Sequence, residues 1–336
     1  MKYWLPMSFR RLTSVATVVT LTVAAMIAVV SAAGTPAYAN MPNEEGSYTH
    51  EVYGNGAWLQ AYGTVAEARN ADGAALRMWR GVDNWTIWAS YGGGNPYVVQ
   101  NGRSPSEPSI VPHGNGFAAF HTGTDGRIYW SRGDGTPNGW QPWQALPFGT
   151  VVGSVAATQV GRRADRSTSI YIGYRGAGGT QLFGAYFDGN TYTWGNEQYM
   201  SGGQSYSHPS LAWDQRTNQI RAAVRGTDTY VWVATQNYGS PNWSGWSRVA
   251  GSPSILDTPT IAVDDNGYRM IGAVADNGHI VYARYDPFAG AWHGWDVDIT
   301  NWRSIYSISI QILGTIFYTI MTGVDDNVYF KRNFRY

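Results

Sequence analysis

The chain has 336 residues and a formal net charge of zero; 43% of its residues are hydrophobic, 15% are aromatic and only 14% are charged. This balance excludes a strongly basic surface, and with it the electrostatic attraction on which nucleic-acid binding usually depends. The absence of cysteine excludes disulfides and thiol catalysis, so stability must come from burial and from closure of the fold.

Residues 1–39 have the pattern of a secretory signal peptide. Basic residues precede an apolar run over 15–30, and Ala37-Tyr38-Ala39 has the small-x-small form of a signal-peptidase site. The run is short for a membrane span, and a retained anchor is the alternative. The mature chain is therefore expected to begin near Asn40, to be secreted and extracellular, and to have no membrane partner. Cleavage would move the formal charge to −3, because three basic and no acidic residues are lost.

Residues 40–336 are expected to form one domain built from a repeat. A Gly-x-Asp turn followed by an aromatic strand recurs at intervals of 42 to 53 residues. The clear copies begin at Gly81, Gly123, Gly226 and Gly323, and degenerate copies begin at Gly176 and at Ala275. A period in this range indicates a radial or solenoid array in which each unit buries one face against the next.

The clearest unit, over 209–249, contains four short β-rich runs separated by Gly, Asn and Asp clusters. Four strands without a helical period predict one blade of a β-propeller. Complete units occur at 66–103, 108–150, 154–200, 208–251 and 258–300, and 307–336 supplies three further strands. The stretch 56–63 resembles the last strand of a unit, so pairing of this N-terminal strand with the final blade would close the ring. The fold is thus predicted to be all-β, a single six-bladed propeller, with seven blades as the alternative count.

The aspartates of the repeated turns are interpreted as turn-formers and not as catalysts. Asp in a tight hairpin bonds its own backbone two residues on, and the neighbouring Gly supplies the positive φ. This interpretation covers Asp83, Asp125, Asp228 and Asp325. A catalytic carboxylate would not need to recur in every blade.

Paired tryptophans recur near the end of the units, as Trp140 with Trp143, Trp243 with Trp246 and Trp292 with Trp295, and more loosely as Trp58 with Tyr62. Repetition favours packing between blades, since a large ring fills the wedge between twisted sheets. The sharper alternative is sugar stacking. In that case Trp143, Trp246 and Trp295 are the candidate ligand-binding residues, each forming a pocket floor.

Catalytic and metal-binding patterns are weak. The six histidines form no HExxH or close pair, and there is no GxSxG elbow, so no catalytic residue, no metal site and no cofactor is predicted. A propeller glycoside hydrolase or lyase remains an alternative, because propellers can bring carboxylates from different blades together. The residues to inspect are Glu67, Glu107, Asp214 and Asp257, near the blade starts.

The Gly-Thr-Asp turn, the Trp-x-x-Trp pair and the Pro-Ser or Pro-Thr start of the next blade, as at Pro108-Ser109, Pro209-Ser210 and Pro259-Thr260, resemble PLL-type and tachylectin-like lectin propellers. The resemblance covers nearly all of the mature chain. It implies a non-enzymatic protein that binds glycans in shallow pockets between blades. The third unit departs from the pattern, with Gly178-Gly179 in place of the Asp turn and Trp194 alone in place of the pair.

The signal peptide and the cysteine-free propeller are also similar in general type to secreted actinobacterial proteins that induce autolysis of a metalloprotease. That similarity implies an extracellular protein partner, a secreted protease, and a role as glutamine donor for transglutaminase. Such an enzyme needs a Gln on an exposed, mobile segment, for which Gln204 is the first candidate and Gln141 and Gln144 are the next. The alternative is that all three are ordinary solvated loop glutamines.

Overall fold

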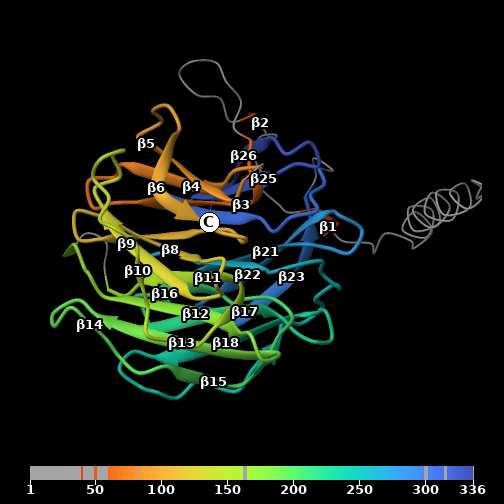
Figure 1. The fold of residues 1–336 in the computed structure, drawn as a ribbon. Coiled ribbons are helices and arrows are strands. Elements are labelled where there is room, and N and C mark those ends of the chain that lie inside the picture. The colour runs from red at the N-terminus through yellow and green to blue at the C-terminus, as the bar shows by residue number, and fades with distance from the viewer. Residues whose placement is uncertain are drawn as a thin grey trace, which may run out of the picture. The chain divides into compact units, whose positions relative to one another are not determined.

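The structure is a computed structural model, which describes residues 39–40, 49–50, 60–82, 84–161, 165–298, 302–313 and 316–335. The predicted signal peptide before Ala39, together with Trp58 and Asp83, lies outside these residues. Every secondary-structure element that lies within the described residues is a β-strand, as the sequence, rich in turn residues and without a helical period, predicts. Figure 1 shows the strands grouped into sheets that surround a common centre.

The strands form six antiparallel sheets, one for each blade. Blades 1 and 2 are β3–β6 (Tyr62–Arg69, Ala75–Arg80, Thr86–Tyr91, Tyr97–Arg103) and β7–β10 (Ser109–His113, Gly116–Thr122, Ile128–Gly133, Gln144–Ala145). Blade 3 is β11–β15 (Val151–Gln159, Ile170–Gly176, Gln181–Asp188, Thr193–Trp194, Gln198–Gln204). Blade 4 is β16–β19 (Ser210–Asp214, Gln219–Arg225, Val231–Asn237, Ser247–Arg248). Blade 5 is β20–β23 (Thr260–Val263, Arg269–Val274, Ile280–Asp286, Ala291–Val297), to which β1 (Ala39–Asn40) adds in parallel. Blade 6 is β24–β26 (Ser309–Leu313, Ile316–Thr322, Val328–Arg335) with β2 (Thr49–His50).

The first strands of the blades line the centre. Each contacts the first strands of the blades on both sides, and β24 of blade 6 contacts β3 of blade 1, so the ring is closed. The predicted six-bladed propeller is therefore confirmed.

Closure by the N-terminal segment is also confirmed. Thr49 and His50 pair with Phe330 and Tyr329 on β26 and supply the fourth strand of blade 6. Gln60 adds an antiparallel bridge to Asn327. The pairing thus begins upstream of the predicted 56–63 strand, of which residues 56–59 lie outside the described residues and Tyr62 and Gly63 belong to β3 of blade 1.

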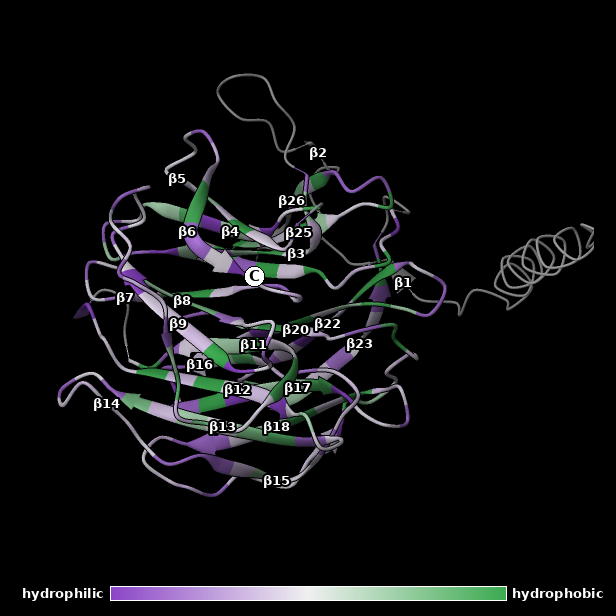
Figure 2. Cartoon of the chain, in the orientation of Figure 1, coloured by the Kyte–Doolittle hydropathy of each residue, from purple (hydrophilic) through white to green (hydrophobic). Residues whose placement is uncertain are grey.

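The hydrophobic core is divided among the interfaces between blades. Six clusters of buried side chains each join one blade to the next. Figure 2 shows hydrophobic residues mainly within the strands, with loops that are mostly hydrophilic or neutral. The predicted packing role of the tryptophan pairs is confirmed: the indole N–H of Trp140 donates to Tyr97 of the preceding blade at 3.2 Å, and Trp243 donates to Tyr171 at 3.3 Å. In this chain without disulfides, the burial of apolar side chains between blades is therefore a main source of stability.

The turn-forming role of the aspartates is confirmed where it is described. Asp125 accepts hydrogen bonds from the backbone N–H of Arg127 at 3.1 Å and the hydroxyl of Tyr129 at 3.0 Å. Asp325 binds Tyr329 in the same way at 2.7 Å. The prediction that the motif's Gly supplies the positive φ is wrong, because in this turn Gly126 and not Gly123 has a positive φ. Gly123 is needed for space, since a Cβ on it would lie 2.6 Å from the Tyr129 ring. The Gly-x-Asp-aromatic motif is thus one packed unit.

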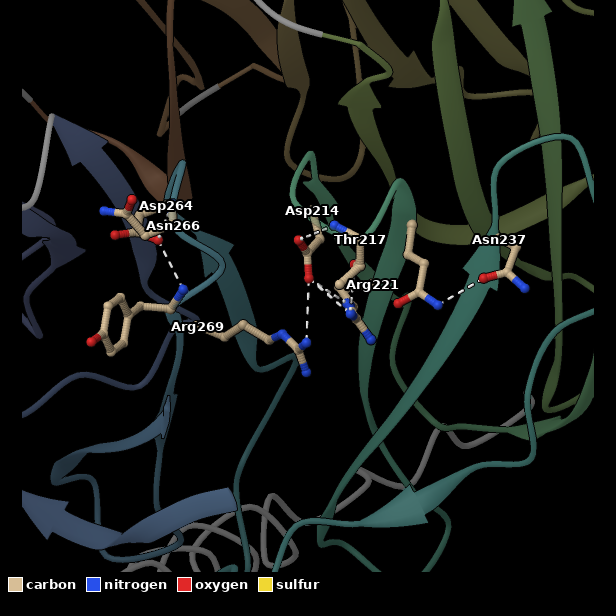
Figure 3. A network of polar contacts seen from close by, with 9 residues as sticks. Asp214, Thr217, Arg221, Asn237, Asp264, Asn266 and Arg269 are labelled. Atoms are coloured by element: carbon tan, nitrogen blue, oxygen red, sulfur yellow. Dashed lines mark hydrogen bonds and ion pairs between the residues drawn. The ribbon is translucent and has the colours of Figure 1, made fainter. Parts of the chain in front are cut away.

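A buried ion network ties blade 4 to blade 5 (Figure 3). Asp214, fully buried at the end of β16, accepts hydrogen bonds from Arg221 of its own blade at 2.8 Å and from Arg269 of β21 at 3.3 Å. The other carboxylate oxygen, Oδ1, accepts a hydrogen bond from the backbone N–H of Thr217 at 3.2 Å. These contacts hold the pKa of Asp214 below its usual value against the opposing effect of burial.

Among the described residues, no helix is long and apolar enough to span a membrane.

Candidate functional site

A pocket of about 480 Å³ lies between blades 3 and 4. This volume is within the range of about 300–1,000 Å³ that is usual for small-ligand sites. Its walls are the end of β15, the turn between β17 and β18, and the segment before β19; they comprise Ser201, Gly202, Gln204, Val224, Gly226, Thr227, Asp228, Trp232, Gly245 and Trp246. Aromatic, hydroxyl, amide and carboxylate groups therefore converge on one hollow.

The glycines of β15 make room for the indole ring of Trp246. Gly202 has a φ of +73°, which a side-chain-bearing residue adopts only with strain. A Cβ on Gly203 would lie 2.9 Å from Nε1 of Trp246. The indole edge therefore lies directly against the backbone of the neighbouring blade.

Trp246 is held as a rigid, partly exposed surface. Its ring stacks on Trp243 with a centroid distance of 6.4 Å and an interplanar angle of 8°. Its Nε1 is buried and has no hydrogen-bond partner. A ring fixed in this way at a pocket wall is suited to stacking against the apolar face of a ligand.

Asp228 supplies a charged group at the pocket rim. One carboxylate oxygen accepts hydrogen bonds from the indole N–H of Trp232 at 2.9 Å and from the N–H of Tyr230 at 3.3 Å. These contacts orient the exposed carboxylate and leave its second oxygen for a ligand. The sequence interpretation treated Asp228 only as a turn-former, and nothing in its motif separates it from Asp125 or Asp325.

The equivalent position between blades 1 and 2 is filled by protein. His121 stands two residues before its turn glycine, as Val224 does before Gly226. The His121 ring stacks on Tyr129 at 5.4 Å and meets the edge of Trp143 at 4.4 Å. Burial lowers the pKa of His121 to about 4, so the ring is neutral at physiological pH. The smaller Val224 leaves that space open between blades 3 and 4.

Trp246 is the predicted ligand-binding residue that lines this pocket. Trp143 instead donates its indole N–H to the carbonyl of Gln100 at 3.1 Å, within the packing of blades 1 and 2. Trp295 is only 5% exposed and packs in the core between blades 4 and 5. Ligand binding by Trp143 and Trp295 stays a prediction.

The three predicted transglutaminase-reactive glutamines are all exposed. Gln204 lies on β15, pairs with Gln181 and lines the pocket, so it is part of a sheet and not of a free loop. Gln141 accepts a hydrogen bond from Arg132 at 3.2 Å, and Gln144 begins β10. Their reactivity stays a prediction.

The carboxylates singled out for possible catalysis fall into two groups: Glu67 and Asp214 are paired with arginines, whereas Glu107 and Asp257 both lie near His208. Glu67 pairs with Arg77 at 2.7 Å, and Asp214 belongs to the arginine network described above. Glu107 lines one end of the central channel and accepts a hydrogen bond from Ser154 at 2.5 Å, while Asp257 holds the N–H of Thr258 at 2.7 Å. That end of the channel holds about 180 Å³. In the described part of the chain, no group of three or more His, Asp or Glu side chains is arranged to hold a metal ion.

Comparisons with known structures agree on the fold. The structure is similar to Aleuria aurantia lectin in complex with Fucalpha1-6GlcNAc (TM-score 0.61, 14% identity, 82% of this chain and 93% of that chain). It is also similar to the SapL1 lectin in complex with alpha methyl fucoside (TM-score 0.55, 12% identity, 79% and 89%) and to a luciferin-regenerating enzyme (TM-score 0.54, 10% identity, 82% and 92%). No protein-family model and no curated protein sequence matches the chain. At these identities the likeness establishes a propeller fold shared by lectins and by an enzyme.

Proposed function

We propose that the protein is a non-enzymatic, lectin-like propeller that binds a glycan in the pocket between blades 3 and 4. The observation that carries the proposal is the fixed indole of Trp246 beside the exposed carboxylate of Asp228 in one open pocket. Sugars present an apolar ring face to aromatic side chains and hydroxyl groups to carboxylates and amides, so this combination fits their chemistry.

The structural neighbours support the same ligand class. Two of them are lectins whose structures contain fucosides, on a propeller that covers most of both chains. The present chain places an aromatic pocket between adjacent blades of that fold. A fucosylated glycan is therefore the first ligand to test.

The test is a glycan array probed with labelled protein starting at Asn40, with heat-unfolded protein as the control. We expect binding to one sugar class that the free sugar competes away. A blank array obtained with folded protein would overturn the proposal and turn the search toward a protein ligand.

The protein is further proposed to act outside the cell, on the basis of the signal-peptide pattern of residues 1–39. Expression of the full chain in a secreting host, followed by N-terminal sequencing of the secreted product, should give a mature N-terminus at Asn40. Retention of the intact N-terminus in the cell fraction would contradict this.

Partnership with a secreted metalloprotease and glutamine donation to transglutaminase form the second candidate function. Their one structural support is the exposure of Gln204, Gln141 and Gln144. Incubation with transglutaminase and a labelled amine, followed by peptide mapping, should place the label on Gln204 first. Labelling that is absent from all three, in protein that remains a good glycan binder, would remove this candidate.

A further inference from the structure

A second hollow, of about 310 Å³, lies at the other end of the central channel from Glu107. It is built from the ends of the six first strands, and side chains such as Ile110, Leu211 and Ile310 border both hollows of the channel. In each blade the first and second strands are antiparallel. The turn after a first strand and the turn after a second strand therefore lie at opposite ends of the blade. The channel hollow and the pocket of Trp246 thus open on opposite faces of the propeller.

An aromatic side chain lines one wall of this hollow. Trp213, on the first strand of blade 4, is partly exposed, and its ring meets the edge of Tyr238 at 5.9 Å. Tyr238 in turn shares a hydrogen bond with Tyr186 of blade 3, with 2.8 Å between the hydroxyl oxygens. Trp213 is therefore held in place by Tyr238, which Tyr186 fixes in turn.

Amide groups from blades 3, 4 and 6 surround the same hollow. Gln159 donates its Nε2 to the carbonyl of Ser167 at 2.6 Å, and Gln311 donates to Ser309 at 3.1 Å. Gln215 donates to the carbonyl of Asp265 at 3.3 Å. Each of these bonds uses one of the two N–H groups of the amide and fixes its orientation, so the carbonyl oxygen and the second N–H remain for a ligand.

Two carboxylates complete the set of acceptors. Asp265 is exposed at the rim. Asp264 also lines the hollow and is only 3% exposed, yet its Oδ2 has no hydrogen-bond partner. Its other oxygen is held by the N–H groups of Asn266 and Tyr268, so the carboxylate is fixed in place (Figure 3). A buried oxygen without a partner is unfavourable unless a donor reaches it, which points to a donor-bearing ligand.

The frame of the hollow is rigid. Asp214, which follows Trp213, is held by arginines from two blades, and Figure 3 shows this network beside Asp264 and Asn266. Preorganised acceptors around a braced aromatic ring are what a saccharide site requires.

We propose that this channel mouth is a second saccharide site, in which a neutral sugar ring stacks on Trp213 and donates its hydroxyls to the surrounding amide and carboxylate oxygens. The ligand class rests on the proposed glycan-binding function, but the site itself is separate from the Trp246 pocket. One chain would then hold sugars on both faces and could link two glycans without oligomerising.

The test uses saturation-transfer NMR with methyl glycosides of fucose, glucose, galactose, mannose and N-acetylglucosamine on the mature protein. In Trp246→Ala, at least one glycoside should keep its signal. That signal should fall at least tenfold when Trp213→Ala or Asp265→Ala is added. The matched control adds Asp276→Ala to the same Trp246→Ala background. Asp276 is an exposed aspartate on the opposite face, so its loss should leave the glycoside signal unchanged. Asp265→Ala removes an exposed side chain and so covers the case in which loss of Trp213 disturbs folding.

The outcomes separate the two sites. Disappearance of every signal in folded Trp246→Ala, or survival of the remaining signal in Asp265→Ala and Trp213→Ala, would overturn the channel-mouth site. A wild-type signal that is insensitive to Trp246→Ala and lost in Asp265→Ala would support this site and remove the pocket between blades 3 and 4.

Discussion

At the scale of the residue, one repeated tryptophan has different surroundings in different blades. Trp246 borders an open pocket, Trp143 packs edge-to-face with His121, and Trp295 is buried. The sequence pattern predicted that these rings pack between blades, and it named Trp246 as one candidate. It could not separate the three, because the difference lies in side chains of neighbouring strands, such as Val224 against His121.

The substitution Val224→His tests this explanation directly. An imidazole at this position should fill the pocket as His121 fills its counterpart, and glycan affinity should fall by tenfold or more, or about 1.4 kcal/mol. Titration calorimetry with the best array glycan gives the affinity. The control is Val224→Ala, which keeps the pocket open; equal affinity of Val224→His and the wild type would contradict the account.

His121 predicts a pH dependence of stability. Burial lowers the pKa of His121 in the folded chain to about 4, below the 6.5 of an exposed histidine. Between these values the unfolded chain binds more protons, so this contribution to stability is complete above pH 6.5 and is lost as the pH falls toward 4. The loss between pH 7 and pH 4 should be roughly 3 kcal/mol. Urea unfolding of the wild type and of His121→Phe, from pH 7 to pH 4, should show a shallower loss for the variant; parallel curves would refute this.

At the scale of the element, the Gly-x-Asp turn and the strand after it form the part of the fold that was most predictable. Local chemistry determines it, since Asp125 bonds backbone and aromatic hydroxyl within four residues. Blade 3 was less predictable. It lacks the Asp turn and splits its last strand into β14 and β15, and β15 then forms a wall of the candidate pocket. Pairing between distant strands, which no local motif encodes, sets that arrangement.

Removal of one turn carboxylate should have a measurable and local effect. Asp125→Ala loses hydrogen bonds to Arg127 and Tyr129, which should lower the free energy of unfolding by about 1 kcal/mol. Chemical denaturation measures the change. Asp276→Ala is the matched control, because Asn277 and not Asp276 bonds the backbone of that turn. An Asp125 variant as stable as this control would show that the motif does not stabilise the fold.

At the scale of the whole molecule, six blades and N-terminal closure followed from counting units and noting that the last lacked a strand. The strand that closes the ring was placed too far along the chain, because Thr49 and His50 belong to no repeat motif. The sequence could not predict which loops share a face or where pockets form, because both depend on how neighbouring blades are rotated against one another.

Closure makes a prediction about truncation. A chain that begins at Gln60 lacks both β1 and β2, so β26 becomes an open edge. We expect its melting temperature to fall by at least about 3 °C relative to a chain that begins at Asn40. Differential scanning calorimetry gives both values. Identical melting temperatures would mean that the N-terminal pairing contributes nothing to stability.

The binding of a glycan against Trp246 is tested by the affinity of the best array glycan, measured in the Asp265→Ala background so that the channel mouth does not contribute, for the protein without a further change, with Trp246→Ala and with Trp85→Ala. Trp85 is 49% exposed on blade 1 and serves as the matched tryptophan control. With circular dichroism confirming that all three proteins are folded, the account predicts that only Trp246→Ala loses binding. Retained affinity in folded Trp246→Ala would contradict it.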